Sequence, residues 1–160
     1  MSARRPPASV YLRSSAYWAV FAVTTIVFGL VIGTIGWLLP SARSYALART
    51  YCWLNVHALR LICGLRWRLH GAEHIPATPH IFFAKHQSTW ETMALVVLLP
   101  PQVHVIKREL LKVPFFGWGH ATLRPIAIDR AAGRAAVTQV TTQGREIGRA
   151  SCRERVCLYV

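Results

Sequence analysis

An uncharged run of 24 residues, from Ala16 to Leu39, constrains this chain more than any other feature. A helix of that length, at about 1.5 Å per residue, covers the ~30 Å hydrocarbon core of a bilayer. Aromatic residues stand near both ends and arginines flank both sides, so the orientation stays open. The run is too long for a signal peptide, and it lacks a small-residue cleavage site. The sequence therefore predicts a membrane helix.

The segment from Ser41 to Gly64 predicts a second helix, with Ser41 as its N-cap and Gly64 as its C-terminal stop. Arginines interrupt its apolar positions, which favours a helix in the membrane interface rather than across it. Cys52 and Cys63 are expected to be small apolar residues of this helix. Two arrangements remain open: a hairpin in one leaflet, or a spanning helix followed by a surface helix.

Composition indicates the partner of such an anchor. Hydrophobic residues make up 53% of the chain, yet the net charge is +13 and the pI is about 10.8. An anionic membrane accounts for both properties. Nucleic acid is the other usual partner of a basic protein, but the cations are scattered and no nucleic-acid motif frames them. We therefore expect an anionic membrane and no nucleic acid.

The hydrophobic pattern changes at Leu65, where apolar and polar residues begin to alternate as in a half-buried strand. Strands and helices then alternate, which predicts an α/β sheet domain. The expected elements are strands at 65–69, 80–84, 103–106 and 125–128, helices at 88–98, at 109–112 and from Ala131, and a loop at 114–119.

His86 and Glu91 are separated by four residues, at a predicted strand-to-helix turn. Open α/β folds present reactive groups where their strands end. An imidazole can take a proton from an alcohol near neutral pH, and a carboxylate can orient it. The alternative is structural, because Ser88-Thr89-Trp90-Glu91 is also a capping box that starts the helix. The residues alone leave both interpretations open.

The remaining histidines and cysteines do not predict a metal site. His70-Gly71-Ala72-Glu73-His74 matches a zinc-protease pattern that requires both imidazoles on one helical face. A strand pattern precedes this segment, Gly71 interrupts it and Pro76 follows, so we expect an exposed turn. The cysteines lack paired ligand spacing.

Three segments in order resemble the lysophospholipid acyltransferase family, in particular its bacterial 1-acylglycerol-3-phosphate acyltransferases, over about residues 65–146. His86-Gln87-Ser88-Thr89-Trp90-Glu91 resembles the family signature of a histidine, four residues and an acid, although most members carry Asp where Glu91 stands. The segment from Val105 to Gly117 resembles the block with a phosphate-associated lysine, and Ile126-Ala127-Ile128-Asp129-Arg130 resembles the block that ends in Asp-Arg. Several ordered blocks are more specific than one motif.

The resemblance implies a glycerolipid acyltransferase-type sheet with flanking helices. It also implies acyl transfer from acyl-CoA or acyl carrier protein to the free hydroxyl of lysophosphatidic acid, giving phosphatidic acid without a cofactor. His86 is the expected base and Glu91 its orienting acid, while Lys107, with Arg124 or Arg130, is expected to hold the substrate phosphate. The expected location is the bacterial inner membrane, with the active site facing the cytoplasm, where the acyl donors are found.

Other functions remain open at this stage. One is acylation of lipid A or of another lysophospholipid, because a histidine-acid motif with Glu also occurs among lauroyl-type acyltransferases. Another is a basic, membrane-anchored binding protein, or an inactive fragment, in which His86 and Glu91 only build a helix start.

The end of the chain does not follow the family pattern. A Phe-Pro-Glu-Gly-Thr-Arg-type block is expected after the helix from Ala131, but Ile147 to Val156 instead resembles the translation of a sequencing adaptor. The predicted organisation is a basic flank at 1–15, membrane-anchoring helices at 16–64, a partial acyltransferase domain at 65–146 and a non-native tail at 147–160.

Overall fold

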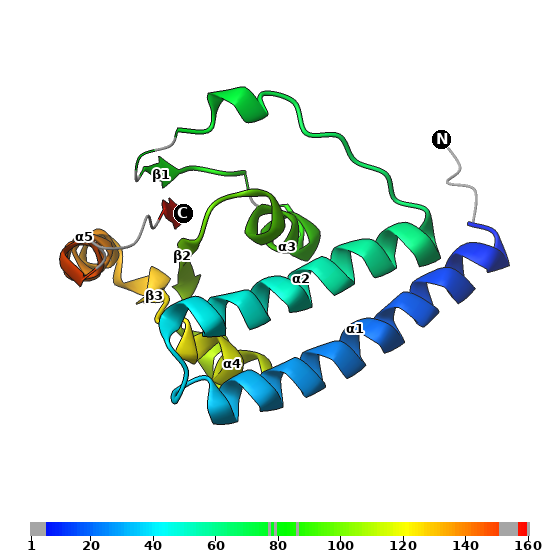
Figure 1. The fold of residues 1–160 in the computed structure, drawn as a ribbon, viewed down its shortest axis with the longest axis horizontal. Coiled ribbons are helices and arrows are strands. Elements are labelled where there is room, and N and C mark those ends of the chain that lie inside the picture. Colours follow the sequence, from blue (N-terminus) through cyan, green and yellow to red (C-terminus); the bar gives the residue numbers. More distant parts are fainter. Residues whose placement is uncertain (1–5, 77, 79, 86, 151–156, 160) are drawn as a thin grey trace.

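A pair of long helices lies against a small sheet domain in this protein (Figure 1). The structure is a computed structural model, and it describes residues 6–76, 78, 80–85, 87–150 and 157–159. The two helices, α1 and α2, run antiparallel along one side of the molecule, and α3 and α4 lie between them and the strands (Figure 1). This arrangement belongs to the predicted α/β class.

Helix α1 spans Ala8–Ile35, so it begins eight residues before the predicted start and includes Arg13. Among the described residues, α1 is the one helix long and apolar enough to cross a membrane. Its most apolar 18-residue window has a mean hydropathy of 2.2. Only 11% of that window is buried inside the protein. The predicted helix is confirmed, and most of its apolar surface faces outward.

Helix α2 spans Ser41–Cys63, close to the predicted range. Gly64 ends it as expected, with a left-handed φ of 73° and its N–H bonded to the Arg60 carbonyl. Ser41 is not the N-cap, because the helix begins one residue earlier than the pattern indicated and Pro40 holds the cap position. Proline fixes φ near the value that a helix start needs, and it needs no amide partner.

Polar side chains join α1 to α2. The Ser44 hydroxyl donates to the Gly36 carbonyl at 2.9 Å, and the Thr24 hydroxyl donates to the Asn55 Oδ1 at 3.1 Å. Asn55 is fully buried, at 0% exposure, and its amide also donates to the Tyr51 carbonyl at 2.9 Å. A buried polar group costs free energy unless it is hydrogen-bonded, and such bonds therefore fix how the two helices face each other.

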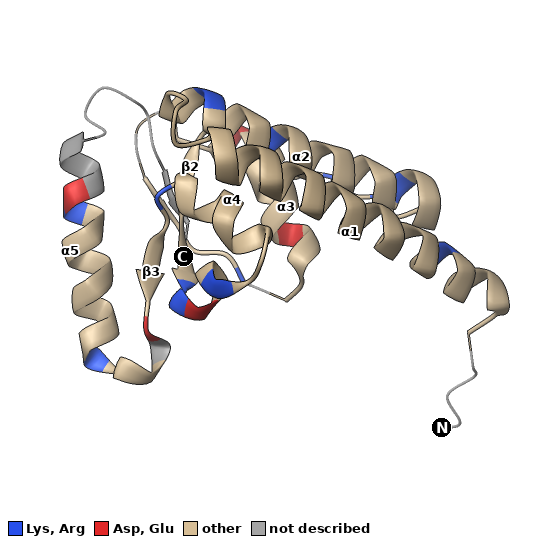
Figure 2. Ribbon diagram, turned by 90° about the horizontal axis from the view of Figure 1, so that it is seen from below, with Lys and Arg blue, Asp and Glu red and all other residues tan. Residues whose placement is uncertain are grey.

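Four parallel strands form the sheet, in the order β1-β4-β2-β3. Their bounds are β1 Ile81–Phe82, β2 Gln102–Lys107, β3 Ile126–Ile128 and β4 Cys157–Tyr159. Helix α3, Thr89–Leu98, follows β1, and helix α5, Arg134–Ala150, follows β3. Helix α5 lies on the other side of the sheet from α3 (Figures 1 and 2). Parallel strands with helices on both sides agree with the expected alternation of strands and helices.

A hydrophobic core connects the helix pair to the sheet domain. Its fully buried members come from α2 and α3, and tyrosines and tryptophans pack around them. These members are Cys52, Val56, Met93, Ala94 and Val96. Because this core contains residues from both sides of Leu65, the helix pair and the sheet domain pack as one unit.

The predicted loop at 114–119 is wrong, because Phe116–Thr122 forms helix α4 and packs against α1. A Cβ atom at Gly29 would lie 2.5 Å from the Phe115 carbonyl oxygen, and one at Gly33 would lie 3.0 Å from Trp118 Cβ. The two glycines are four residues apart, so they share a helix face and let the backbones approach closely. Tertiary packing therefore outweighs the low helix propensity of this glycine-rich segment.

Two further predicted elements differ from the structure. Residues 65–69 are not a strand, because no neighbouring strand pairs with them among the described residues and only Trp67 packs inward, on Trp90. The helix predicted from Ala131 begins at Arg134, after the short 3-10 turn η3 (Arg130–Ala132) and a break at Gly133. Alternation favours a strand only where a pairing edge is available.

Replacing Gly29 by alanine tests the contact between α1 and α4. The new Cβ would clash with the Phe115 backbone, so we expect the free energy of unfolding to fall by about 1–3 kcal/mol, as for overpacked sites. The control is Gly144→Ala in α5, where a Cβ meets its nearest atom at 3.9 Å. Urea unfolding in detergent should show a loss for Gly29→Ala alone; equal stability of the two variants would contradict this packing.

Candidate active site

The carboxyl ends of β1, β2 and β3 lie along one edge of the sheet. Lys107 is the last residue of β2 and pairs with Ile128, the last residue of β3, so the Asp129-Arg130 segment begins beside Lys107. Phe82, the last residue of β1, occupies the same row of the sheet as His104, through β4. The topology therefore directs the three family-like segments toward one edge, where α/β folds place their ligands.

His86 lies outside the described residues. The chain leaves β1 at Phe82, and α3 begins at Thr89 after Ser88 as N-cap. The predicted base thus belongs to the short connection from a strand end to a helix start, as the sequence indicated.

Glu91 forms the capping box of α3, with the Ser88 side chain and the Glu91 carboxylate each accepting a backbone N–H. The Glu91 Oε1 accepts the Ser88 N–H at 3.1 Å and also the Gln87 N–H. Gln87 directly follows His86 in the chain. The carboxylate therefore holds the backbone that carries the predicted base, so the capping interpretation is correct and leaves an orienting role open.

Lys107 forms an exposed ion pair with Glu109. Its Nζ lies 3.8 Å from Glu109 Oε2, and about half of each side chain is exposed. An exposed ion pair of this kind contributes only about 0–1 kcal/mol. A phosphate group can therefore displace Glu109 at little cost, and Lys107 remains available for an anionic ligand.

The two predicted arginines lie at opposite ends of β3. Arg130 begins the turn η3 directly after the carboxyl end, and the Asp129 side chain accepts the Ala131 N–H there at 2.9 Å. Arg124 precedes β3, is exposed, and has a left-handed φ of 50°. The fold brings Arg130 to the edge that carries Lys107, but it places Arg124 at the other edge.

The sequence analysis missed two histidines, of which His104 is buried, at 7% exposure, and His120 is partly buried. His104 in β2 and His120 in α4 stack with ring centroids 5.7 Å apart, and Phe116 stacks on His120 at 5.2 Å. Burial lowers the pKa of His104 to about 3, with help from the neighbouring His120, and burial lowers the pKa of His120 to about 4. Both rings are therefore neutral near pH 7. In the sequence, uncharged residues flank both histidines, and this pattern could have indicated that their rings face the protein interior.

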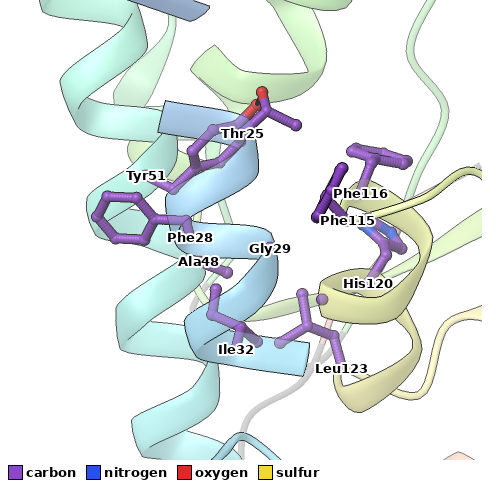
Figure 3. Close-up of a pocket in the computed structure, with 11 residues that line it drawn as sticks. Thr25, Phe28, Gly29, Ile32, Ala48, Tyr51, Phe115, Phe116, His120 and Leu123 are labelled. Carbon is purple, nitrogen blue, oxygen red and sulfur yellow. Dashed lines mark hydrogen bonds between the residues drawn. The ribbon is translucent and has the colours of Figure 1, made fainter. Parts of the chain in front are cut away.

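A small apolar cavity of about 50 Å³ lies between α1, α2 and α4 (Figure 3). Phe28, Ile32, Phe115 and Leu123 line it, and the His120 ring forms part of its wall. Ligand pockets usually measure about 300–1,000 Å³. This space is too small for a lipid chain and is a packing gap beside His120.

The histidines of the zinc-protease pattern do not share a helical face. Residues Ala72–His74 form the 3-10 turn η1, Gly71 has a left-handed φ of 80°, and both His70 and His74 are exposed. The predicted exposed turn is confirmed.

Comparison with protein families settles the classification. A family model described as "Acyltransferase" matches residues 66–157. The chain belongs to this acyltransferase family. The matched range holds all the family-like segments, and it extends into the tail predicted to be non-native.

Curated members of this acyltransferase family resemble the chain over different lengths. It is 38% identical over 136 residues to a 1-acyl-sn-glycerol-3-phosphate acyltransferase of Pseudomonas aeruginosa, covering 84% of this chain and 53% of the relative. It is 34% identical over 82 residues to the Saccharomyces cerevisiae protein of the same name, covering 51% of this chain and 27% of the relative. The chain thus spans about half the length of the bacterial relative. No solved structure matches the fold.

The histidine pair predicts a pH dependence of stability. Unfolded histidines bind protons below about pH 6.5, whereas the folded rings resist protonation until about pH 3 to 4, so stability should fall as the pH drops through this range. Each histidine contributes up to about 1.4 kcal/mol per pH unit. Urea unfolding between pH 7 and pH 4 should show a shallower loss for His104→Gln/His120→Gln than for the parent, and parallel curves would contradict the burial of neutral rings.

Proposed function

We propose that this acyltransferase moves an acyl group from acyl-CoA or acyl carrier protein to the free hydroxyl of lysophosphatidic acid, giving phosphatidic acid. The observation that carries the proposal is the pairing of Lys107 with Ile128, which brings the Lys107 segment beside the Asp129-Arg130 segment at the carboxyl ends of β2 and β3. The names of both curated relatives support the same acceptor.

The reaction needs one base and one phosphate site. His86 takes the proton of the acceptor hydroxyl while the oxygen attacks the thioester carbonyl. The tetrahedral intermediate then expels the thiolate, which receives the proton from the imidazolium and leaves as a free thiol. No covalent acyl-enzyme forms, which agrees with Ser88 being occupied as a helix cap.

Glu91 acts as a positioning residue in this mechanism. Its Oε1 accepts the N–H groups of Gln87 and Ser88, so it fixes the backbone beside His86 even before any direct contact with the ring. A carboxylate near the imidazole also stabilises the imidazolium that forms during the reaction. Glutamate at this position, in place of the usual aspartate, can serve both roles because its longer side chain reaches back around the helix start.

The substrate phosphate is held at the carboxyl edge by Lys107 and Arg130. Phosphate accepts charge-assisted hydrogen bonds from ammonium and guanidinium groups. Arg124 is the less suitable candidate, because it precedes β3 while Lys107 and Arg130 stand at the other strand end.

The helix pair holds the enzyme at a bilayer surface in this proposal. Helix α4 packs against the Gly29–Gly33 part of α1, and α3 packs against Cys52 and Val56 of α2. If α1 crossed the bilayer, much of the sheet domain would enter the hydrocarbon core. The arrangement therefore favours a hairpin in one leaflet. We assign this leaflet to the cytoplasmic side of the inner membrane, because the acyl donors are cytoplasmic.

The proposed domain limits and the non-native tail have a separate test. Strand β4, Cys157–Tyr159, lies in the tail and pairs with both β1 and β2. Resequencing the locus decides whether residues 147–160 belong to the native reading frame. A continuous native frame through them would overturn the adaptor hypothesis.

His86→Ala should abolish most acyl transfer. Losing a general base costs about 10²–10⁴-fold in kcat. The assay uses the intact gene product in vesicles and follows phosphatidic acid formation from lysophosphatidic acid. His70→Ala, in the exposed turn, is the matched control and should retain activity. Undiminished turnover of His86→Ala would refute the assignment.

Glu91→Gln separates capping from catalysis. The amide retains an acceptor oxygen for the cap, so the free energy of unfolding should fall by no more than about 1 kcal/mol. If the carboxylate also supports the imidazolium, kcat should drop at least tenfold in the folded variant. A stable variant with near-parental kcat would restrict Glu91 to capping; Glu73→Gln is the exposed control.

Lys107→Ala should weaken acceptor binding. A lost charge-assisted bond to phosphate, worth about 1.5–3 kcal/mol, predicts at least a tenfold rise in the KM for lysophosphatidic acid. The KM for the acyl donor should change little. A selective rise of the donor KM would instead assign Lys107 to the donor site, and comparison with other lysophospholipid acceptors tests the acceptor class.

A further inference from the structure

A basic hollow lies beside the C-terminal end of α2, where the chain enters the connection to η1. Its volume is about 520 Å³, within the ~300–1,000 Å³ that is usual for ligand pockets. Gly64 ends α2 with a left-handed φ of 73°, so the chain turns there and brings the following residues beside the last turn of the helix. We call the hollow, with the four residues that line it, the arginine hollow. These residues are Arg60, Arg66, Trp67 and Arg68.

The three arginines of the hollow have no acidic partner. Their side chains are exposed, and no ion pair in the described part of the chain includes them. The sequence contains no Asp or Glu before Glu73, and the Glu73 carboxylate lies 3.6 Å from His74 Nε2. Like charges held close together repel each other, so a bound anion would lower the electrostatic energy of all three guanidinium groups. Phosphate is the anion that guanidinium groups recognise with paired N–H donors.

Trp67 connects the arginine hollow to the start of α3. Its ring lies against Trp90, with ring centroids 6.4 Å apart, and both rings pack against the hydrophobic core. Trp90 directly precedes Glu91, and the Glu91 carboxylate accepts the N–H of Gln87. The tryptophan pair therefore joins the hollow to the turn that carries the predicted base.

The chemistry of acyl-CoA matches this arrangement. A long pantetheine arm separates its thioester from a 3′-phosphorylated ADP group, so the thioester can lie at the His86 turn while the nucleotide binds farther away. Several phosphate groups suit several guanidinium groups, and an adenine ring can pack against an indole. The phosphopantetheine arm of acyl carrier protein ends in a single phosphodiester and has no adenine.

We propose that the arginine hollow binds the phosphorylated nucleotide end of acyl-CoA. The inference rests on the proposed function and names the donor site of that reaction. It gives the enzyme two separate phosphate sites. Lys107 and Arg130 hold the acceptor at the carboxyl edge of the sheet, and the arginine hollow holds the donor beyond the tryptophan pair.

Calorimetric titration of the intact gene product, in uncharged detergent, measures donor binding directly. The parent should bind CoA more tightly than 3′-dephospho-CoA. Arg66→Gln/Arg68→Gln should weaken CoA binding by about tenfold or more, as expected for lost charge-assisted bonds, and should remove most of this difference. The control is Arg43→Gln/Arg145→Gln, which removes two exposed arginines at the other end of α2 and in α5 and should bind CoA like the parent. Equal CoA affinity of the two double variants would overturn the inference.

Steady-state kinetics separate donor binding from a structural role. Arg66→Gln/Arg68→Gln should raise the KM for acyl-CoA by about tenfold or more. The KM for lysophosphatidic acid, and the kcat with acyl-phosphopantetheine, which lacks the nucleotide, should stay unchanged. A fall in kcat with every donor would make these arginines structural and overturn the inference. A rise in KM for acyl carrier protein alone would assign the hollow to a protein donor and would also overturn it.

Sedimentation with phosphatidylglycerol vesicles distinguishes the nucleotide from a lipid headgroup. The parent and Arg66→Gln/Arg68→Gln should bind these vesicles equally. Loss of vesicle binding with unchanged CoA affinity would make the hollow a headgroup site and overturn the inference. A parent that transfers no acyl group from any donor would refute the proposed function, whereas the comparison of CoA with 3′-dephospho-CoA would still decide whether the hollow binds the nucleotide.

Discussion

The close contact between α1 and α4 determines how the rest of this molecule is arranged. Gly29 and Gly33 remove side chains from one face of α1, so the backbone around Phe115 and the Cβ of Trp118 can approach it. Phe115 adopts a left-handed φ of 62° at the start of α4, a conformation that costs about 1–3 kcal/mol outside glycine. Packing against α1 offsets that cost. The long apolar helix and the sheet domain thereby share one interface.

Hydrogen bonds between α1 and α2 reinforce this arrangement. Ser44, Tyr51 and Asn55 of α2 bond to Gly36, which follows α1, and to Thr25 and Thr24 of α1. These bonds fix the direction in which the two helices face each other, whereas apolar packing alone permits sliding. The core around Cys52 and Met93 then joins this helix pair to α3 of the sheet domain.

The candidate site depends on the parallel sheet in the same manner. Its residues come from segments far apart in the chain, and the direct parallel pairing of β2 with β3 brings the Lys107 and Asp129-Arg130 segments to one edge. Glu91 combines a local and a tertiary role, because this helix cap also holds the backbone N–H of Gln87. The turn η2 directly follows Lys107 at the same edge.

The sequence by itself determined the elements with strong local signals. The uncharged run marked α1, Gly64 ended α2, the capping box began α3, and the ordered motifs identified the acyltransferase family. Each of these signals lies within a few residues along the chain, where propensity, capping and charge act directly.

Only the tertiary structure decided the features that depend on distant partners. Residues 65–69 alternate like a strand, but no strand in the described part of the chain lies beside them. The glycine-rich 116–122 segment is helical because α1 supports it. The stacking of His104 on His120 and the separation of Arg124 from Lys107 also follow from strand order and helix packing. Such contacts join residues that no local pattern connects, because their free energy comes from burial against a surface formed elsewhere in the chain.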